Sequence, residues 1–193
     1  MTMSKGRLEA FSDGVIAILI TIMVLELRTP HGADLAALAP LWPKFASYAV
    51  SFVFLGIYWN NHHHMLQATR HVDGRILWAN MHLLFWLSLF PFATAWTGES
   101  HFAPVPVATY GVVQLLAGVA YFILSRLLVA RHGADSPLAR AMGSDRKGRI
   151  SLTLYGVAIG AAFPAPWISC AIFLVVMVMW LVPDSRIEKV LAE

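Results

Sequence analysis

The distribution of apolar residues along the chain predicts a bundle of membrane-spanning helices. Residues 11–25 are apolar at all but three positions, and a helix of roughly 20 residues at about 1.5 Å per residue crosses a bilayer. Five further apolar stretches follow, separated by segments that contain proline, glycine or charged residues. We expect these spans at residues 45–62, 76–96, 107–128, 150–163 and 167–182, and a short helical turn at 35–38. The predicted fold class is therefore all-α: a polytopic membrane protein with six transmembrane helices in a single domain, residues 1–193.

The first span carries two features on different sides of its helix. At about 100° per residue, four residues share one narrow stripe: Gly14, Ile18, Thr21 and Leu25. Asp13 lies roughly 140° from Ile18 by the same count. A charge at membrane depth costs on the order of 3 kcal/mol or more, which makes Asp13 a candidate functional residue. We expect another helix to supply its hydrogen-bond partners and the stripe to face something else.

Composition narrows the class of protein. Hydrophobic residues make up 58% of the chain and the mean hydropathy is +0.64, which is typical of a polytopic membrane protein. Six spans leave only loops, so we expect no soluble domain. Asp13 interrupts the apolar part of the first span and no small-residue cleavage site follows, which favours a retained helix over a signal peptide. Because the sequence has no nucleotide-binding loop, catalytic triad or cofactor motif, we expect neither an enzyme nor a bound cofactor, and no nucleic-acid partner.

Basic residues are distributed unevenly between the two sides of the predicted bundle. The N-terminus, the second and fourth loops and the tail hold 12 of the 14 Lys and Arg residues, while the other side has only Arg28 and Lys44. By the positive-inside rule, both termini are expected in the cytoplasm, in a multi-pass protein of the cell membrane. The most basic segment, residues 126–149, is also suited to binding anionic lipid headgroups, although topology explains its charge equally well.

Three consecutive histidines, His62 to His64, suggest a metal site at first sight. Successive residues on a helix point about 100° apart, so the three side chains cannot bind one ion together. Helical metal pairs need i, i+4 spacing instead. We therefore expect no metal site and interpret the histidines as an interfacial, partly hydrogen-bonded cluster.

Polar residues elsewhere in the chain allow two interpretations of Asp13. In one, Asp13 and His62 titrate and relay protons, as in a proton-coupled secondary transporter. In the other, Asp13 anchors a buried hydrogen-bond network that holds the first helix against the second and third. Such a network would contain Ser12, Trp59, His62 and Asn80. Secondary transporters tend to contain internal repeats and broken helices, and neither is evident in this sequence.

One sequence motif in the first span is a much more specific signal than the apolar pattern of that span. It reads Arg-x-x-x-Phe-Ser-Asp, followed by Ala-Ile and a Thr, and comprises Arg7, Phe11, Ser12, Asp13, Ala17, Ile18 and Thr21. This pattern resembles the signature of the transmembrane protein 175 family of potassium channels. Trp59 and His62 resemble the family's Trp-x-x-His, while Asn80 and Pro91 resemble features of its third helix. The specific likeness covers residues 7–92 and implies the single-repeat bacterial type.

The resemblance implies a function and roles for particular residues. In that family the first helices of four copies line a central pore, so the resemblance implies a homotetramer in membrane lipid that conducts potassium ions passively. Ile18 and Leu25 would form the hydrophobic pore constriction, flanked by Ile22, and Thr21 would contribute to selectivity. The signature-motif network would comprise Arg7, Phe11, Ser12, Asp13, Trp59, His62 and Asn80. A proton-coupled transporter and a non-conducting structural protein remain the alternatives.

Overall fold

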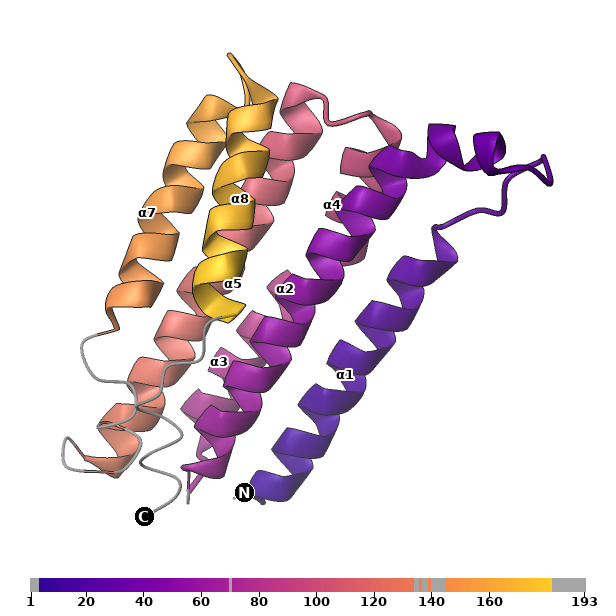
Figure 1. Ribbon diagram of the computed structural model, residues 1–193. Helices are drawn as coiled ribbons and strands as arrows, with labels where there is room; N and C mark the ends of the chain where they lie inside the picture. The colour runs from indigo at the N-terminus through magenta and orange to yellow at the C-terminus, as the bar shows by residue number, and fades with distance from the viewer. Residues whose placement is uncertain (1–3, 70, 134–135, 137–138, 140–144, 182–193) are drawn as a thin grey trace.

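The computed structural model describes residues 4–69, 71–133, 136, 139 and 145–181, and these residues form helices and their connections without a strand (Figure 1). In this part of the chain the helical elements are α1 (Lys5–Leu25), the short 3-10 helix η1 (Leu35–Leu41), α2 (Trp42–Gln67), α3 (Gly74–Ser88), α4 (Phe90–Glu99), α5 (Pro104–His132), α7 (Arg146–Ala161) and α8 (Pro166–Leu181). Because α3 and α4 together make one predicted span, the expected all-α fold with six helical passes is confirmed.

The third predicted span is interrupted. α3 ends at Ser88 and α4 begins at Phe90, with Leu89 between them. Pro91 lies in the first turn of α4, and it has no N–H to donate to the carbonyl of Leu87 one turn earlier. Two consecutive short helices, α3 and α4, therefore replace the single helix that the hydropathy pattern predicted at residues 76–96.

Four of the six passes are long and apolar enough to cross a bilayer: α1, η1 with α2, α3 with α4, and α5. α7 and α8 have 16 residues each. At 1.5 Å per residue this is about 24 Å, which is shorter than the roughly 30 Å hydrocarbon core. These two helices are the short fifth and sixth spans of the sequence prediction, and α8 is apolar. The four long apolar passes support a location in a membrane.

Aspartates mark the start of three helices. Asp34, Asp73 and Asp145 each accept a hydrogen bond from a backbone N–H in the first turn of η1, α3 and α7, respectively. The end of α2 differs from the prediction, because the helix continues from His62 to Gln67. All three consecutive histidines are therefore helical, and the turn after α2 begins five residues later than predicted.

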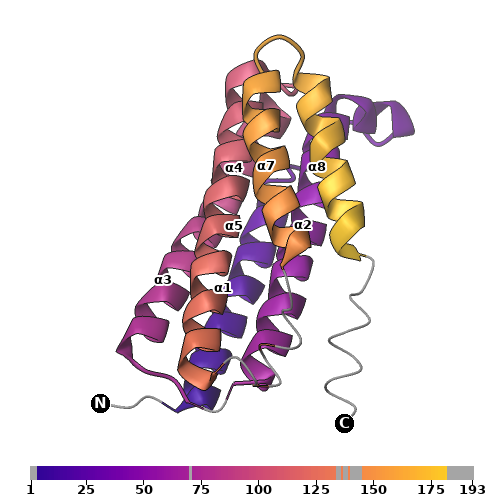
Figure 2. The same cartoon turned by 90° about the vertical axis from the view of Figure 1, so that its left-hand side faces the viewer.

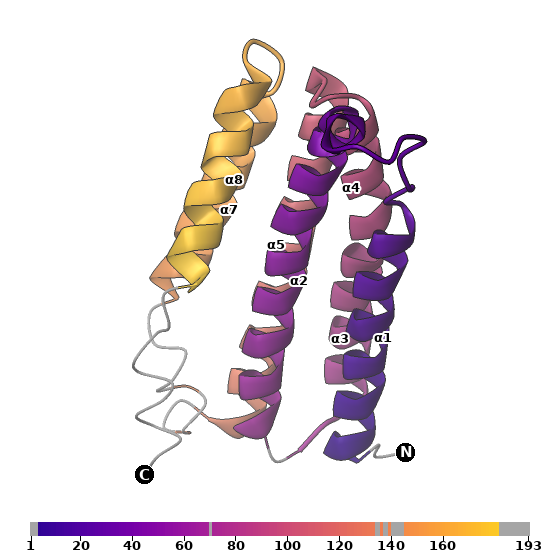
Figure 3. The ribbon, with the colours of Figure 1, turned by 45° about the vertical axis from the view of Figure 1, so that its right-hand side comes forward.

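The connections lie at two ends of the bundle. We call the end where α1 begins the Lys5 end and the end where it finishes the Leu25 end. The α2–α3 connection lies at the Lys5 end, whereas η1 and the α4–α5 and α7–α8 turns lie at the Leu25 end (Figure 1). α1 occupies one edge of the bundle and α7 and α8 the opposite edge (Figures 1 and 3). Figure 2 views the bundle with α5 and α7 in front of α1.

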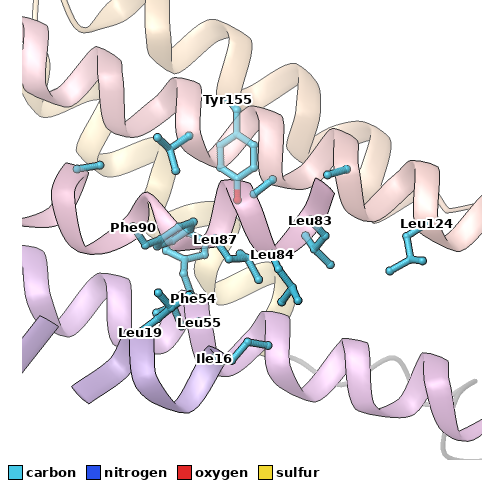
Figure 4. Close-up of a cluster of buried hydrophobic side chains, with 14 of the residues drawn as sticks. Ile16, Leu19, Phe54, Leu55, Leu83, Leu84, Leu87, Phe90, Leu124 and Tyr155 are labelled. Atoms are coloured by element: carbon cyan, nitrogen blue, oxygen red, sulfur yellow. The ribbon is translucent and has the colours of Figure 1, made fainter. Parts of the chain in front are cut away.

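Large side chains from six helices fill the centre of the bundle (Figure 4). Phe54 of α2, Leu87 of α3 and Phe90 of α4 are almost fully buried there. Close packing of α7 on α5 depends on Gly118, since a Cβ at this position would lie 2.9 Å from the Leu152 side chain. One side of α1 packs against this centre, where it contacts α2, α3 and α4.

Candidate functional site

The apolar stripe of α1 points away from its own bundle. The opposite face of the helix is buried against α2, α3 and α4, and it consists of Leu8, Ser12, Ile16, Leu19 and Met23. Gly14 and Thr21 are exposed on the stripe, where Ile18 is 58% exposed and Leu25 is 77% exposed. The stripe is therefore the uncovered side of a helix that is anchored along its other side.

Side chains of two kinds make up this uncovered surface. Ile18, Ile22 and Leu25 present branched apolar groups, and all three are exposed. Thr21 lies among them, and its Oγ1 donates a hydrogen bond to the Ile18 carbonyl oxygen at 2.8 Å. Since the hydroxyl proton is used within the helix, the threonine oxygen remains available as an acceptor for a cation or for water.

Arg7 and Phe11 lie on the uncovered side of α1, towards the Lys5 end. Both are exposed. Arg7 lies only about 20° from Ile18 around the helix, three turns earlier. Within the described chain the Arg7 guanidinium forms no ion pair. These two motif residues thus face outward with the stripe, on a different side of the helix from the buried Ser12.

Ser12, Asn80 and His62 form a buried hydrogen-bond chain across three helices. Ser12 and Asn80 are 0% exposed and His62 is 1% exposed. The Asn80 Nδ2 donates to Ser12 Oγ at 2.9 Å, and Ser12 Oγ donates to the Leu8 carbonyl at 2.9 Å. Asn80 Oδ1 therefore faces His62, whose Nε2 lies 2.7 Å away. Each hydrogen bond in this series is donated in the direction of α1. The series therefore ties α1 to α3 and, through His62, to α2.

The direction of these hydrogen bonds also determines the tautomer of His62. Because Asn80 Oδ1 is an acceptor, the His62 Nε2 must carry the proton and donate it. The other ring nitrogen, Nδ1, is buried and has no hydrogen-bond partner in the described structure. A second proton on this ring would have no acceptor there, so the geometry suits a neutral His62.

Asp13 belongs to a different group of contacts. Its Oδ1 accepts a hydrogen bond from Trp59 Nε1 at 3.0 Å. Asp13 is half-buried and Trp59 is exposed, unlike the three residues of the buried chain. The five polar residues singled out in the sequence thus lie near one another in two sets: the Asp13–Trp59 pair and the Ser12–Asn80–His62 chain.

The Asp13–Trp59 bond is one step of a ladder between α1 and α2. Lys5 Nζ donates to the Gln67 carbonyl at 3.0 Å, and His63 Nδ1 lies 3.0 Å from Glu9 Oε1. The three contacts advance four residues at a time along α1 and retreat four at a time along α2. Such regularity follows from two antiparallel helices with 3.6 residues per turn. Sequence reasoning missed the two outer steps, because they depend on the register between the helices.

A second buried polar group lies closer to the Leu25 end. Thr94 Oγ1 donates to Ser51 Oγ at 2.7 Å, and Ser51 Oγ lies 3.0 Å from the Tyr110 hydroxyl. Gln114 Nε2 donates to the same Tyr110 oxygen at 3.3 Å. The sequence analysis did not single out Ser51, Thr94 or Gln114. Isolated hydroxyl and amide residues within apolar spans were the available signal, since such groups need partners when buried.

The three consecutive histidines have separate surroundings. His62 points into the bundle, as described above. His63 lies between Glu9 and Gln67, and its ring stacks on Trp59 with centroids 5.9 Å apart. The Nδ1 atom of His64 is buried without a hydrogen-bond partner in the described structure. His62 therefore contacts α3 and His63 contacts α1, and the three histidines do not converge on one point.

Together these features are those expected of a subunit of an oligomeric membrane channel. α1 is held on one side by apolar packing and directional hydrogen bonds, while its other side presents branched apolar groups and a hydroxyl. A helix that lines the pore of an oligomeric channel needs this combination, because the pore surface must be exposed in one copy and rigidly placed.

Comparisons with known proteins identify the family. The model of the endosomal/lysosomal potassium channel TMEM175 family matches residues 7–91. A potassium channel of Chryseobacterium sp. (strain P1-3) is 52% identical over 191 residues, which cover 99% of this chain and 100% of that protein. A potassium channel of Streptomyces collinus is 34% identical over 177 residues, 82% of each chain. The chain belongs to the TMEM175 family, whose members are channels and not enzymes.

A solved structure shows the same fold. The crystal structure of a lysosomal potassium-selective channel TMEM175 homolog from Chamaesiphon minutus superimposes with a TM-score of 0.79. It is 28% identical and covers 92% of this chain and 96% of its own. The chicken endosomal/lysosomal proton channel TMEM175 is 29% identical over 180 residues, and this match covers only 36% of the longer vertebrate protein.

Proposed function

We propose that this protein is a potassium channel and that the stripes of four α1 helices, one from each copy, line its pore. The observation that carries the proposal is the stripe itself, which stays uncovered while the rest of α1 is anchored to the bundle. One copy contributes one such helix and cannot enclose a pore alone, so several copies must meet along α1. The names of the bacterial relatives support potassium as the permeant ion.

The composition of the stripe suits a narrow gate. A constriction formed by Leu25 and by a ring of Ile18 side chains, flanked by Ile22, would exclude water and impose a desolvation barrier on a cation. Thr21 would place four hydroxyl oxygens next to that ring. Hydroxyl oxygens replace part of an ion's hydration shell, and they favour potassium because it sheds water more readily than sodium.

The hydrogen-bond chain and the ladder have a supporting role in this proposal. The Ser12–Asn80–His62 chain would hold α1 at the distance from the pore axis at which the stripes meet. Asp13 and Trp59 would set the rotation of the helix about its own axis. Arg7 and Phe11 lie on the pore side, where Arg7 would face the cytoplasmic entrance.

The distribution of charge supports an orientation in the cell membrane. Among the described residues, the Lys5 end carries Lys5, Arg7, Arg75, Arg126 and Arg131, while the Leu25 end carries Arg28 and Lys44. At the Leu25 end Lys44 is paired with Glu99 at 2.9 Å. By the positive-inside rule the Lys5 end would face the cytoplasm, and both termini are expected on that side. Each subunit would consist of one six-helix unit, residues 1–193.

A flux assay tests the proposed activity. The purified protein is reconstituted into liposomes that contain a potassium gradient, and uptake of a tracer cation is measured with and without a proton gradient. We expect flux that follows the potassium potential and needs no proton gradient. Flux that requires a proton gradient would support a transporter that uses Asp13 and His62, although these residues bond to Trp59 and Asn80 and not to each other. Absence of flux would leave a structural role.

Thr21→Ala tests the origin of selectivity. Removing four hydroxyls beside the constriction is expected to lower the potassium-to-sodium permeability ratio about fivefold, if the ring contributes on the order of 1 kcal/mol. Conduction itself should persist, because alanine keeps the helix and does not block the pore. Reversal potentials in mixed potassium and sodium solutions measure the ratio.

Thr153→Ala is the matched control for this change. Thr153 is an exposed threonine of α7 whose hydroxyl also donates within its own helix, to the Arg149 carbonyl at 3.1 Å. We expect its replacement to leave the ratio unaltered. Equal ratios for the wild type and Thr21→Ala would locate selectivity outside the threonine ring.

A further inference from the structure

A cavity of about 150 Å³ lies between α2, α4, α5 and α8, near the Leu25 end of the bundle. Its wall is largely hydrocarbon and includes Val50 of α2, Val107 of α5, Phe173 of α8 and Phe102 of the turn between α4 and α5. Among the described residues, α1 contributes nothing to this wall. The cavity is therefore separate from the stripe to which we assign the pore.

The polar residues of the wall form their hydrogen bonds elsewhere. The Ser47 hydroxyl donates to the Lys44 carbonyl oxygen at 3.0 Å, and the Thr97 hydroxyl donates to the Pro106 carbonyl oxygen at 3.3 Å. The Tyr110 hydroxyl belongs to the second buried polar group described above. The surface that faces the cavity is consequently almost entirely apolar.

This surface makes water a poor occupant of the cavity. A buried water typically forms about three hydrogen bonds to polar groups of the protein, and the wall presents almost no polar surface to supply them. An apolar cavity of about the same volume in a soluble protein stays dry and binds benzene or xenon. The volume and the lining thus both fit a small apolar molecule.

The cavity has a deep end within the bundle and a mouth at its surface. Val107 is 0% exposed and Phe173 is 4% exposed. Ala46 and Cys170 are half-buried, and Leu174 is exposed. The mouth therefore lies between α2 and α8, and Ala46 and Cys170 are only about 6 Å along the axis from the first residues of these helices. A molecule dissolved in this part of the bilayer can enter without crossing water.

We propose that this cavity binds one small, uncharged apolar molecule, about the size of benzene, which enters from the bilayer. The rings of Phe102, Tyr110 and Phe173 provide the contact surface, as aromatic side chains do in apolar binding sites. A polar molecule of similar size, such as phenol, binds more weakly because its hydroxyl loses its partners outside and finds almost none in the wall. The bound molecule fills the space between α8 and the helices α2, α4 and α5.

Photolabelling with halothane tests the site, because halothane is small and apolar and attaches to nearby side chains when light breaks its carbon–bromine bond. The full-length protein is irradiated in phosphatidylcholine liposomes, and labelled peptides are mapped by mass spectrometry. We expect labelling of residues 107–110 and 170–174 that saturates with halothane concentration. Labelling of Val178, which is 56% exposed on α8, should rise linearly instead.

Competition between benzene and phenol tests the apolar character of the site. Excess benzene should lower the saturable labelling at least about fivefold. Phenol at the same concentration in the bilayer should lower it less than about twofold, since an unpaired hydroxyl weakens binding by about fivefold or more.

Ala46→Leu adds three carbon atoms at the mouth and should lower the saturable labelling at least about fivefold. Ala49→Leu is the matched control, because Ala49 is an exposed alanine of the same helix and does not line the cavity. We expect unaltered labelling in this variant. Cys170→Leu fills the cavity from α8 and provides the same test if Ala46→Leu folds poorly.

Three results would overturn the proposal. Labelling without a saturable component would mean that lipid chains cover this surface and that no defined site exists. Equal labelling in a filling variant and in Ala49→Leu would place the bound halothane outside the cavity. Equal competition by phenol and benzene would show that the wall accepts polar groups. None of these measurements uses ion flux, so they leave the pore assignment of α1 to its own tests.

Discussion

Ile18→Ala is expected to increase the single-channel conductance for potassium, and that for sodium as well. If four Ile18 side chains meet on the pore axis, shortening them widens and wets the constriction. Each kcal/mol removed from the barrier increases the rate of ion transfer about fivefold. Single-channel recording from planar bilayers measures this change. Ile18→Asn should act in the same direction, because a polar ring also holds water.

Ile16→Ala is the matched control, since the same change is made two residues away on the opposite face of α1. Ile16 is 1% exposed, whereas Ile18 is 58% exposed. Truncation of a buried isoleucine leaves a cavity and costs about 2–5 kcal/mol. We therefore expect Ile16→Ala to lower the thermal stability and the yield of assembled protein. If Ile18→Ala instead behaved like Ile16→Ala and reduced the current, Ile18 would be a packing residue and α1 would not line the pore.

The number of helical passes follows from the sequence because a spanning helix needs a long apolar run. The interruption at Leu89 does not follow in the same way. Proline is tolerated within membrane helices, and only the surrounding packing decides whether the helix bends or stops. The end of α2 was also set too early, since hydropathy falls at His62. The helix continues because polar contacts replace apolar packing there, including a 2.8 Å bond between Gln67 and His63.

The stripe of α1 could be predicted because a period of 3.6 residues separates the two faces of any helix. Which face would be uncovered depended on the packing of α2, α3 and α4, and no periodicity in α1 contains that information. The same limit applies to Asp13. Its chemistry indicated a partner on another helix, but the hydropathy pattern did not indicate that Ser12 and Asn80 would be buried while Asp13 remained half-buried.

Asn80→Leu is expected to have the largest effect on stability among changes to the polar residues. Leucine fills a similar volume, so the loss is mainly one of hydrogen bonds. A typical bond between membrane helices contributes only about 0.6 kcal/mol. In this variant, however, the His62 Nε2–H would lose its acceptor in a fully buried place, and an unpaired buried donor costs about 1–3 kcal/mol. We expect about 2–4 kcal/mol in total, measured as a lower midpoint of thermal unfolding.

Asn60→Leu is the control for this prediction, because it makes the same change at an exposed position of α2. Its effect should lie within about 0.5 kcal/mol of zero. Asp13→Ala should fall between the two, at about 1 kcal/mol, since the Asp13–Trp59 bond is partly exposed. Stability equal to that of the wild type in Asn80→Leu would show that apolar packing alone holds α1. Assembly and potassium current should decline together with stability in Asn80→Leu, because the chain from His62 to Ser12 is the buried hydrogen-bonded link that joins α1 to both α2 and α3.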